Sequence, residues 1–333
     1  MQVVSNQEKS LPPVSVVIIG RNEAGNIREC VESVLKMDYP QELLEVIYVD
    51  TGSTDGTQNI ASAAGARVVE VRSLSPCAAL ARNTGLKESK HGVMHFVDGD
   101  MAIAPGYLKK AVERLAAGDA ASVIGRVTER HSETNWISRV LNIDWKKKEE
   151  GYINAPGGGG TFIRAALEKI GGYNVGLPVA EEIDIGIRLR AAGYRICLIN
   201  DVMAAHDYGV NSVWELALRY YGSGRGRFRI LVCRDVPEEI RKSSWKLPRQ
   251  AAIALAVISL MLFLGYGYEV LALLFSYPVI YPAVVVLADW KNIVTKKLGL
   301  DAFLYTYIFG VMKPVIFLGM VRESVEYGIK RLK

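Results

Sequence analysis

Short β-branched runs alternate with helical segments through the first third of the chain, and this alternation limits the fold more than any other feature. The expected strands are 14–19, 45–49, 67–71 and 93–97, and the expected helices are 26–36, 58–64 and 78–89. Near-continuous apolar strands separated by helices are typical of βαβ units, whose strands are buried on both faces. The pattern predicts an α/β domain around a mostly parallel sheet.

Polar residues stand directly after three of the expected strands. They are Arg21-Asn22-Glu23, Asp50 and the triplet Asp98-Gly99-Asp100. Ligands of such sheets bind beyond the carboxyl ends of the strands, so these side chains are the first candidates for a site. Two carboxylates one residue apart can hold a divalent cation, which can neutralise a diphosphate. Read alone, the triplet is as consistent with a solvated turn.

The character of the chain changes at Gln250. The stretches 251–267 and 270–288 are apolar and are expected to cross a bilayer as a helical hairpin. A third apolar stretch, 302–321, contains Lys313-Pro314, which favours a re-entrant or interfacial element. A buried helical domain without lipid contact is the alternative for this region.

Basic residues flank the expected hairpin. Lys246 and Arg249 precede it, and Lys291, Lys296 and Lys297 follow it. The positive-inside rule then places both flanks, and the domain before them, on the cytosolic side of the cytoplasmic or plasma membrane.

Charge and cysteine content narrow the partners. The 333 residues carry a formal net charge of +5, and the basic residues gather at 219–249 and 291–333. This placement suits an anionic membrane surface and predicts membrane lipids, not nucleic acid, as a partner. The four cysteines are dispersed without zinc-ligand spacing, which indicates a reducing compartment. The polar first 13 residues contain no secretory signal.

Companion motifs accompany the acidic triplet in a fixed order. They are Val16-Val-Ile-Ile-Gly-Arg-Asn22-Glu23, Tyr48-Val-Asp50-Thr-Gly52-Ser53-Thr-Asp55-Gly56-Thr57, Ala81-Arg82-Asn83-Thr-Gly85, Phe96-Val-Asp98-Gly-Asp100, Gly157–Gly160, Gly171-Gly172-Tyr173 and Glu181-Glu182-Ile-Asp184. This set resembles the family 2 glycosyltransferases of the GT-A fold, over about residues 13–230. We therefore expect an N-terminal tail at 1–12, a Rossmann-like GT-A domain at 13–235 and a membrane-associated helical region at 236–333.

The resemblance implies a role for each matching position. The residues implied to bind a nucleotide-sugar are Gly20, Asn22, Glu23, Asp50, Arg82, Asp98, Gly99 and Arg225. Asp98 and Asp100 are the implied metal ligands for Mg²⁺ or Mn²⁺, and His206 is a candidate third ligand, although a lone histidine is more often structural. Many relatives carry a second aspartate where this chain has Thr51, which leaves the identity of the nucleotide base open.

Transfer of a sugar to a hydroxyl with inversion needs a general base. Glu182 stands where the family usually has the aspartate of a Glu-Asp pair, and Glu181 is the alternative base. The glycine segment 157–160 is implied to border the donor sugar and the acceptor.

The sequence thus predicts an inverting, metal-dependent, non-processive glycosyltransferase that uses a lipid-linked or polymeric glycan acceptor. A polyprenyl-phosphate glycosyl synthase is a close alternative, because its acceptor phosphate needs no base. A nucleotidyltransferase or dehydrogenase on a related sheet is a further alternative, although no GxGxxG follows the first strand. A membrane-tethered nucleotide-binding protein without catalysis is the non-enzymatic one.

Overall fold

The computed structural model describes most of the first 232 residues and the C-terminal helix. The described residues are 10–73, 75–130, 132–133, 135–142, 149–177, 179–232, 238, 240–242, 246, 248–250, 264–265 and 299–332. Backbone contacts divide the chain into two units. The first unit comprises 1–127, 149–175 and 181–206, and the second comprises 128–148, 176–180 and 207–333.

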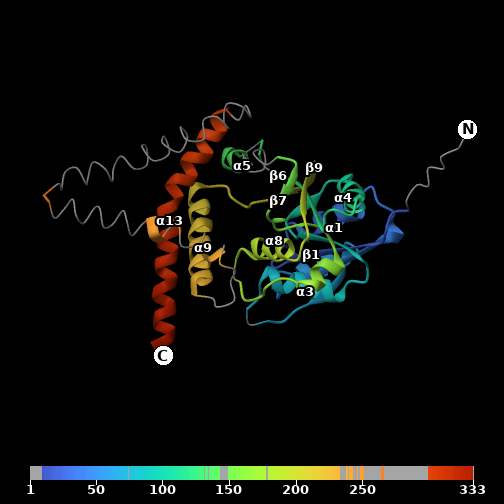
Figure 1. Ribbon diagram of the computed structural model, residues 1–333, viewed down its shortest axis with the longest axis horizontal. Coiled ribbons are helices and arrows are strands. Elements are labelled where there is room, and N and C mark those ends of the chain that lie inside the picture. The colour runs from blue at the N-terminus through green and yellow to red at the C-terminus, as the bar shows by residue number, and fades with distance from the viewer. Residues whose placement is uncertain are drawn as a thin grey trace, which may run out of the picture. The chain divides into compact units, whose positions relative to one another are not determined.

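A nine-stranded sheet and its flanking helices dominate the described part of the chain (Figure 1). The strands are β1 Val14–Gly20, β2 Leu44–Asp50, β3 Arg67–Glu70, β4 Val93–Asp98, β5 Met101–Ile103, β6 Ser122–Glu129, β7 Gly151–Ile153, β8 Gly160–Ile163 and β9 Ile196–His206. The helices of the first unit are α1 Ile27–Leu35, α2 Thr57–Ala63, α3 Ala78–Glu88, α4 Tyr107–Leu115, α7 Arg164–Lys169 and α8 Glu181–Ala191, and a short 3₁₀ helix covers Gln41–Leu43. Every strand and helix predicted up to residue 97 is therefore present within one residue of its expected bounds.

The sheet is mixed, which corrects the expectation of a mostly parallel sheet. The strand order is β3-β2-β1-β4-β8-β6-β9-β5, and β7 pairs with β9. Strands β3, β2, β1 and β4 are parallel, as their βαβ connections require. Strand β8 then joins β4 in antiparallel register, and the pairs β6–β8, β5–β9 and β7–β9 are also antiparallel. The parallel half ends at β4, where the chain stops alternating strand with crossover helix.

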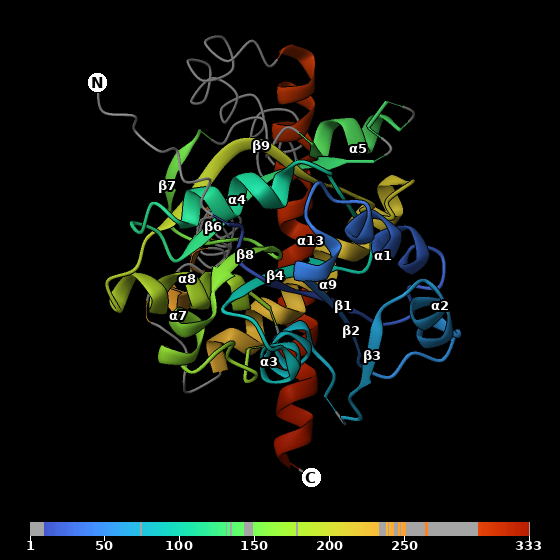
Figure 2. The same cartoon turned by 90° about the vertical axis from the view of Figure 1, so that its right-hand side faces the viewer.

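One face of the sheet carries a continuous apolar core. Val17 and Ile19 of β1 point into it, together with side chains from α3, α7 and α8. Helices α1 and α4 lie across the sheet from α3 (Figure 2). Gly85 lets α3 approach β1 closely, because a Cβ at this position would lie 2.1 Å from Val17 Cγ1. This close approach sets the position of the α3 residues that face the strand ends.

The second unit contains three described helices, α5 Trp136–Leu141, α9 Val213–Val232 and α13 Gly299–Leu332. Helices α9 and α13 pack against each other through glycines. A Cβ at Gly224 would lie 1.9 Å from Ile316 O, and one at Gly319 would lie 2.1 Å from Tyr221 O. A small apolar core that includes Leu216 and Met312 joins the same helices to α5.

Helix α13 continues through Lys313-Pro314 without a break, and the re-entrant or interfacial element expected at 302–321 stays a prediction. The proline is exposed and lies fifteen residues inside the helix, between Met312 and Val315, which pack in the apolar core of the second unit. The predicted spans 251–267 and 270–288 fall outside the described residues, apart from a turn at 264–265. Among the described helices, none is both long and apolar enough to cross a membrane.

Candidate active site

The loop after β2 is organised around the buried carboxylate of Asp50. Its Oδ1 accepts the backbone N–H groups of Gly52 and Ser53 at 2.8 Å each. Its Oδ2 accepts the Tyr48 hydroxyl at 3.0 Å and the Ser53 hydroxyl. Burial alone raises the pKa of Asp50, but the hydrogen bonds from Ser53 and Gly52 outweigh it and hold the pKa below its ordinary value. Asp50 is thus an ionised anchor of its own loop, and its predicted contact with a nucleoside stays a prediction.

The loop after β1 is held to the loop after β2. Asn22, which has a φ of 58°, accepts the Thr54 N–H on its side chain and donates its own N–H to Ser53 Oγ. Glu23 N–H donates to Thr57 Oγ1 at 2.9 Å. These bonds fix the predicted nucleotide-binding loop 20–23 on the neighbouring strand end.

Glu23 also belongs to the acidic side of the site. Burial raises its pKa, against a hydrogen bond from Asn26, and the nearby carboxylates of Asp100 and Asp98 raise it further. Two glycines make this approach possible. A Cβ would lie 3.1 Å from Glu23 Cγ if placed on Gly20, and 3.2 Å from it if placed on Gly99.

Arg82 connects the acidic triplet to Glu181, the alternative candidate for the base. Its Nη2 donates to Asp98 Oδ1 at 2.8 Å, and its Nη1 donates to Glu181 Oε1 at 2.9 Å. The Arg82 side chain is 2% exposed. One guanidinium thereby holds the end of β4 and the start of α8, although Glu181 lies 99 residues after Arg82 in the chain. The strand end that was predicted to bind a cation and the helix start that carries the two candidate bases therefore lie together.

Tyr173 supports this guanidinium, a role that sequence reasoning did not assign. Its ring lies 5.4 Å from Arg82 Cζ and packs edge-on against Phe96. The neighbouring Asn83 donates to Tyr173 O and accepts from Tyr173 N, both at 2.7 Å. The signal in the sequence was Gly171-Gly172-Tyr173: both glycines have positive φ, and a Cβ on Gly172 would lie 2.6 Å from Asn83 Oδ1.

Glu181 and Glu182 occupy different environments although they are adjacent at the start of α8. Glu181 is ion-paired with Arg82. For Glu182, burial and then the negative charge of Glu181 raise the pKa to about 7. A carboxylate with this pKa is suited to take a proton near neutral pH. Asp184 lies about one helical turn after Glu181. It accepts a hydrogen bond from Arg188 Nε at 2.8 Å, one turn further along α8, and so stabilises this helix.

His206, at the end of β9, lies beside Asp100 because β5 pairs with β9. Its Nε2 is 3.1 Å from Asp100 Oδ2. Burial of Asp98, together with the charge of Asp100, raises the pKa of Asp98, although Arg82 opposes the shift. Among the described residues no three His, Cys, Asp or Glu side chains are spaced to hold a metal ion by themselves. The predicted trio Asp98, Asp100 and His206 is thus present as neighbours but not as a complete protein cage.

The donor set nevertheless fits a cation that is shared with a diphosphate. Mg²⁺ is commonly held by one or two carboxylates together with substrate phosphates, and Mn²⁺ accepts the same oxygen donors. Two ligands in adjacent positions of a six-coordinate shell with bonds of about 2.1 Å stand about 3 Å apart. The Asp100–His206 separation of 3.1 Å matches this spacing. A bound cation would also relieve the repulsion between Asp98 and Asp100.

The glycine segment predicted to border the sugars lies against Asp98. A Cβ on Gly158 would stand 2.9 Å from Asp98 Oδ2, and one on Gly159 would stand 2.9 Å from Phe96 O. Any larger residue at 158 would occupy the space beside the carboxylate oxygen that Arg82 does not bind. Glycine at position 158 therefore keeps the space beside Asp98 open, in addition to shaping the loop.

Arg225 lies in the second unit, on α9. Its Nε donates to Glu323 Oε2 at 2.6 Å and its Nη2 to Glu326 Oε2 at 2.7 Å, both on α13. Its guanidinium is therefore already neutralised by carboxylates, and its predicted part in nucleotide binding stays a prediction.

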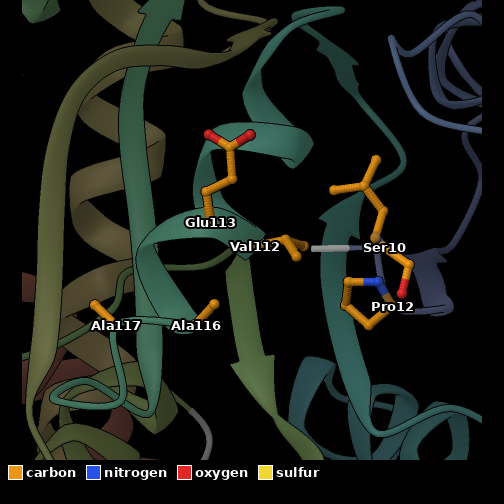
Figure 3. Close-up of a pocket in the computed structure, with 7 residues that line it drawn as sticks. Ser10, Pro12, Val112, Glu113, Ala116 and Ala117 are labelled. Atoms are coloured by element: carbon orange, nitrogen blue, oxygen red, sulfur yellow. The ribbon is translucent and has the colours of Figure 1, made fainter. Parts of the chain in front are cut away.

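Two cavities in the described residues lie apart from the strand ends that carry the site. A cavity of about 350 Å³ is lined by Ser10, Leu11, Pro12, Val112, Glu113, Ala116 and Ala117 (Figure 3). It is largely apolar and contains none of the predicted site residues. The other, of about 490 Å³, is bordered by Lys87 and Arg164 among others. Its lining includes Asn83 and Gly172, which lie beside Tyr173, but neither Arg82 nor the acidic residues of the site.

Comparison with known proteins places these features in a family. Residues 15–169 match the model of Glycosyl transferase family 2. The chain is similar to glycosyltransferase AglE of Haloferax volcanii, with 27% identity over 66% of this chain and 75% of that protein. It is also similar to a β-monoglucosyldiacylglycerol synthase of Nostoc sp., with 24% identity over 66% of this chain and 50% of that protein.

A solved structure gives the same fold. The mannosyltransferase PcManGT from Pyrobaculum calidifontis, in complex with GDP-Man and Mn²⁺, superposes with a TM-score of 0.57 and 21% identity. The match covers 93% of this chain and 88% of that one. This likeness confirms the predicted GT-A-type α/β fold, with a mixed sheet in place of a mostly parallel one.

Proposed function

Because this chain belongs to the family 2 glycosyltransferases and is a transferase enzyme, we propose that it moves a sugar, with inversion and with a divalent cation, from a nucleotide-sugar to a lipid-linked or polymeric glycan. The observation that carries the proposal is the bridge from Arg82 to both Asp98 and Glu181. Asp98, at the strand end proposed to bind the diphosphate, and Glu181, next to the proposed base Glu182, contact the same buried guanidinium.

Glu182 is the general base in this proposal. Glu181 Oε1 accepts a hydrogen bond from Arg82 Nη1, so this oxygen is committed to the guanidinium. Within the described part of the chain no cation is ion-paired with Glu182, and its raised pKa gives it proton affinity near neutral pH. Glu182 takes the proton of the acceptor hydroxyl as the acceptor oxygen bonds to the anomeric carbon and the bond from that carbon to the nucleoside diphosphate breaks.

Asp98, Asp100 and His206 would hold the cation, which neutralises charge on the leaving diphosphate. The chain itself positions these ligands: Arg82 fixes Asp98, the β5–β9 pairing fixes His206, and Gly158 leaves room beside Asp98. Gly20, Asn22, Glu23, Asp50 and Gly99 form the adjoining pocket wall for the nucleoside.

The acceptor is proposed to be at the cytosolic face of a membrane. The relative from Nostoc sp. is a β-monoglucosyldiacylglycerol synthase, whose product is a lipid, and this chain spans half of that protein's length. The apolar stretches 251–267 and 270–288 and their basic flanks favour the same placement. A polyprenyl-phosphate acceptor would not need Glu182, so the retained carboxylate pair favours a hydroxyl acceptor.

The proposal is tested by measuring nucleoside-diphosphate release from a panel of nucleotide-sugars, GDP-mannose and UDP-glucose among them, with Mg²⁺, Mn²⁺ or chelator, and with membrane extract as acceptor. We expect release from at least one donor only when cation and extract are both present. The control variants are Asp98→Asn and Glu182→Gln, which should lose release. Absence of release from every donor would overturn the proposal, and full turnover by Glu182→Gln would favour the phosphate acceptor.

A further inference from the structure

One face of the C-terminal half of α13 is apolar and exposed. Leu318, Val321, Val325 and Ile329 are 59%, 42%, 53% and 51% exposed. At 100° per residue the four side chains fall on one stripe, and Pro314, also exposed, extends it. The stripe is about 16 Å long between Leu318 and Ile329, at 1.5 Å per residue. We call these five residues the α13 stripe.

The opposite face of α13 packs against α9, so α9 does not cover the stripe. Glu323, 8% exposed, receives hydrogen bonds from Arg225 and Arg229 of α9 at 2.6 and 2.7 Å. Gly319 stands against Tyr221 of α9. Figure 1 shows α9 and α13 side by side along much of their length. Helix α13 is therefore held in one rotation about its axis, with the stripe directed away from α9.

The charge around the stripe is positive. The segment that carries the stripe, from Lys313 to Lys333, has five basic residues against Glu323 and Glu326. Arg322 borders the stripe, and its side chain is 64% exposed. An apolar stripe with basic residues beside it is typical of helices that lie in the surface of an anionic bilayer. A second copy of this chain would bring like charges together, which is unfavourable.

The position of α13 in the chain favours the same occupant. The helix begins eleven residues after the apolar stretch 270–288, which is expected to lie in the bilayer. We propose that the α13 stripe rests in the acyl boundary of an anionic membrane surface, with the helix parallel to that surface. The proposal rests on the membrane placement in the proposed function. It extends that placement beyond 302–321 to Ile329, and makes α9–α13 the element that is seated on lipid.

Site-specific photo-cross-linking on the full chain tests the stripe. A benzophenone amino acid replaces Val325 or, in a second variant, Leu318, and the protein is reconstituted into vesicles with equal parts of phosphatidylcholine and phosphatidylglycerol. Matched controls carry the same group at Ser324, about 100° around the same helix, and at the exposed Lys87 on α3. We expect lipid adducts at Val325 and Leu318 several-fold above both controls, and a several-fold decrease in vesicles of phosphatidylcholine alone.

The other outcomes overturn the proposal. A cross-linked dimer would show that a second copy covers the stripe, and an internal cross-link to residues 251–298 would show that this chain covers it. No adduct at either position, or equal yield at Ser324, would also refute it. Nucleoside-diphosphate release is measured on the same vesicles. Release without lipid adducts would refute the membrane role of the stripe and leave the proposed function standing. Lipid adducts without release would support the role of the stripe and count against the proposed function.

Discussion

Replacing Glu181 with glutamine separates the two candidate bases more sharply than any other single change. The charge of Glu181 is the second cause, after burial, of the raised pKa of Glu182. Two carboxylates about 5 Å apart at an effective dielectric constant of about 20 repel each other by roughly 3 kcal/mol, or about two pKa units. Arg82, bound to Glu181, offsets part of this repulsion, which leaves about one unit.

The variant removes the negative charge and leaves the Arg82 cation, and both changes favour ionised Glu182. The pKa of Glu182 should therefore fall by about one unit or more. A general base works only when deprotonated, so the acid limb of kcat/KM against pH should move to lower pH by the same amount. The assay is nucleoside-diphosphate release between acidic and mildly basic pH, with Glu181→Asp as the control that keeps the charge.

The reasoning would be refuted if the acid limb of Glu181→Gln stayed in place or moved to higher pH. It would also fail if Glu182→Gln kept wild-type turnover while Glu181→Gln lost activity at every pH. Loss of folding is a separate outcome, because Glu181 is a partner of a buried arginine. It is recognised by thermal unfolding of the same preparation, and Glu181→Asp then still reports whether the charge sets the limb.

Three further changes follow from the same contacts. Arg82→Leu should destabilise the fold by about 3–5 kcal/mol, because it leaves two carboxylates without their buried cation. Denaturant unfolding would measure the loss. Arg82→Lys cannot bind both carboxylates at once and should recover only part of the lost stability. Gly85→Ala should cost about 1–3 kcal/mol and lower Tm, since its Cβ meets Val17 at 2.1 Å, whereas Gly92→Ala, with open space around it, is the matched control and should change Tm little. Gly158→Ala should leave Tm nearly unchanged but lower kcat/KM about tenfold, equivalent to roughly 1.4 kcal/mol, by crowding Asp98; equal turnover in the variant would show that this space is not used.

The parallel half of the fold could be predicted because its signals are local. The apolar runs of β1, β2 and β4 and the helices between them are each complete within one short segment, and their order dictates parallel pairing. The antiparallel half could not. Strands β5 and β7 are three residues long and β8 is four, too short for a periodic pattern. Their partners lie far along the chain, as in the pairing of Phe96 with Gly160.

The membership of the site was predictable, but its internal connections were not. Asp98 stood out as a polar residue after a strand, and the family resemblance named Arg82 and Glu181. Nothing local shows that one guanidinium serves both carboxylates, because this depends on the helix–sheet distance that Gly85 permits. The sequence ranked Glu182 above Glu181 as the base only through the family resemblance and could not show their different environments. It gave Tyr173 no role although its motif was visible.

Arginine at position 82 has a geometric reason. Its two terminal nitrogens reach carboxylates that arrive from different directions, Nη2 to Asp98 and Nη1 to Glu181. A planar fork can hold both at once, whereas an ammonium group is a single point charge. Asp98 serves the leaving diphosphate in the proposed reaction and Glu181 adjoins the base, so one rigid group fixes the spacing between the two ends of the transfer. Burial strengthens the constraint, because a cation that is 2% exposed cannot exchange either partner for water without a large free-energy cost. The separation of base and diphosphate is therefore set by the fold before any substrate binds.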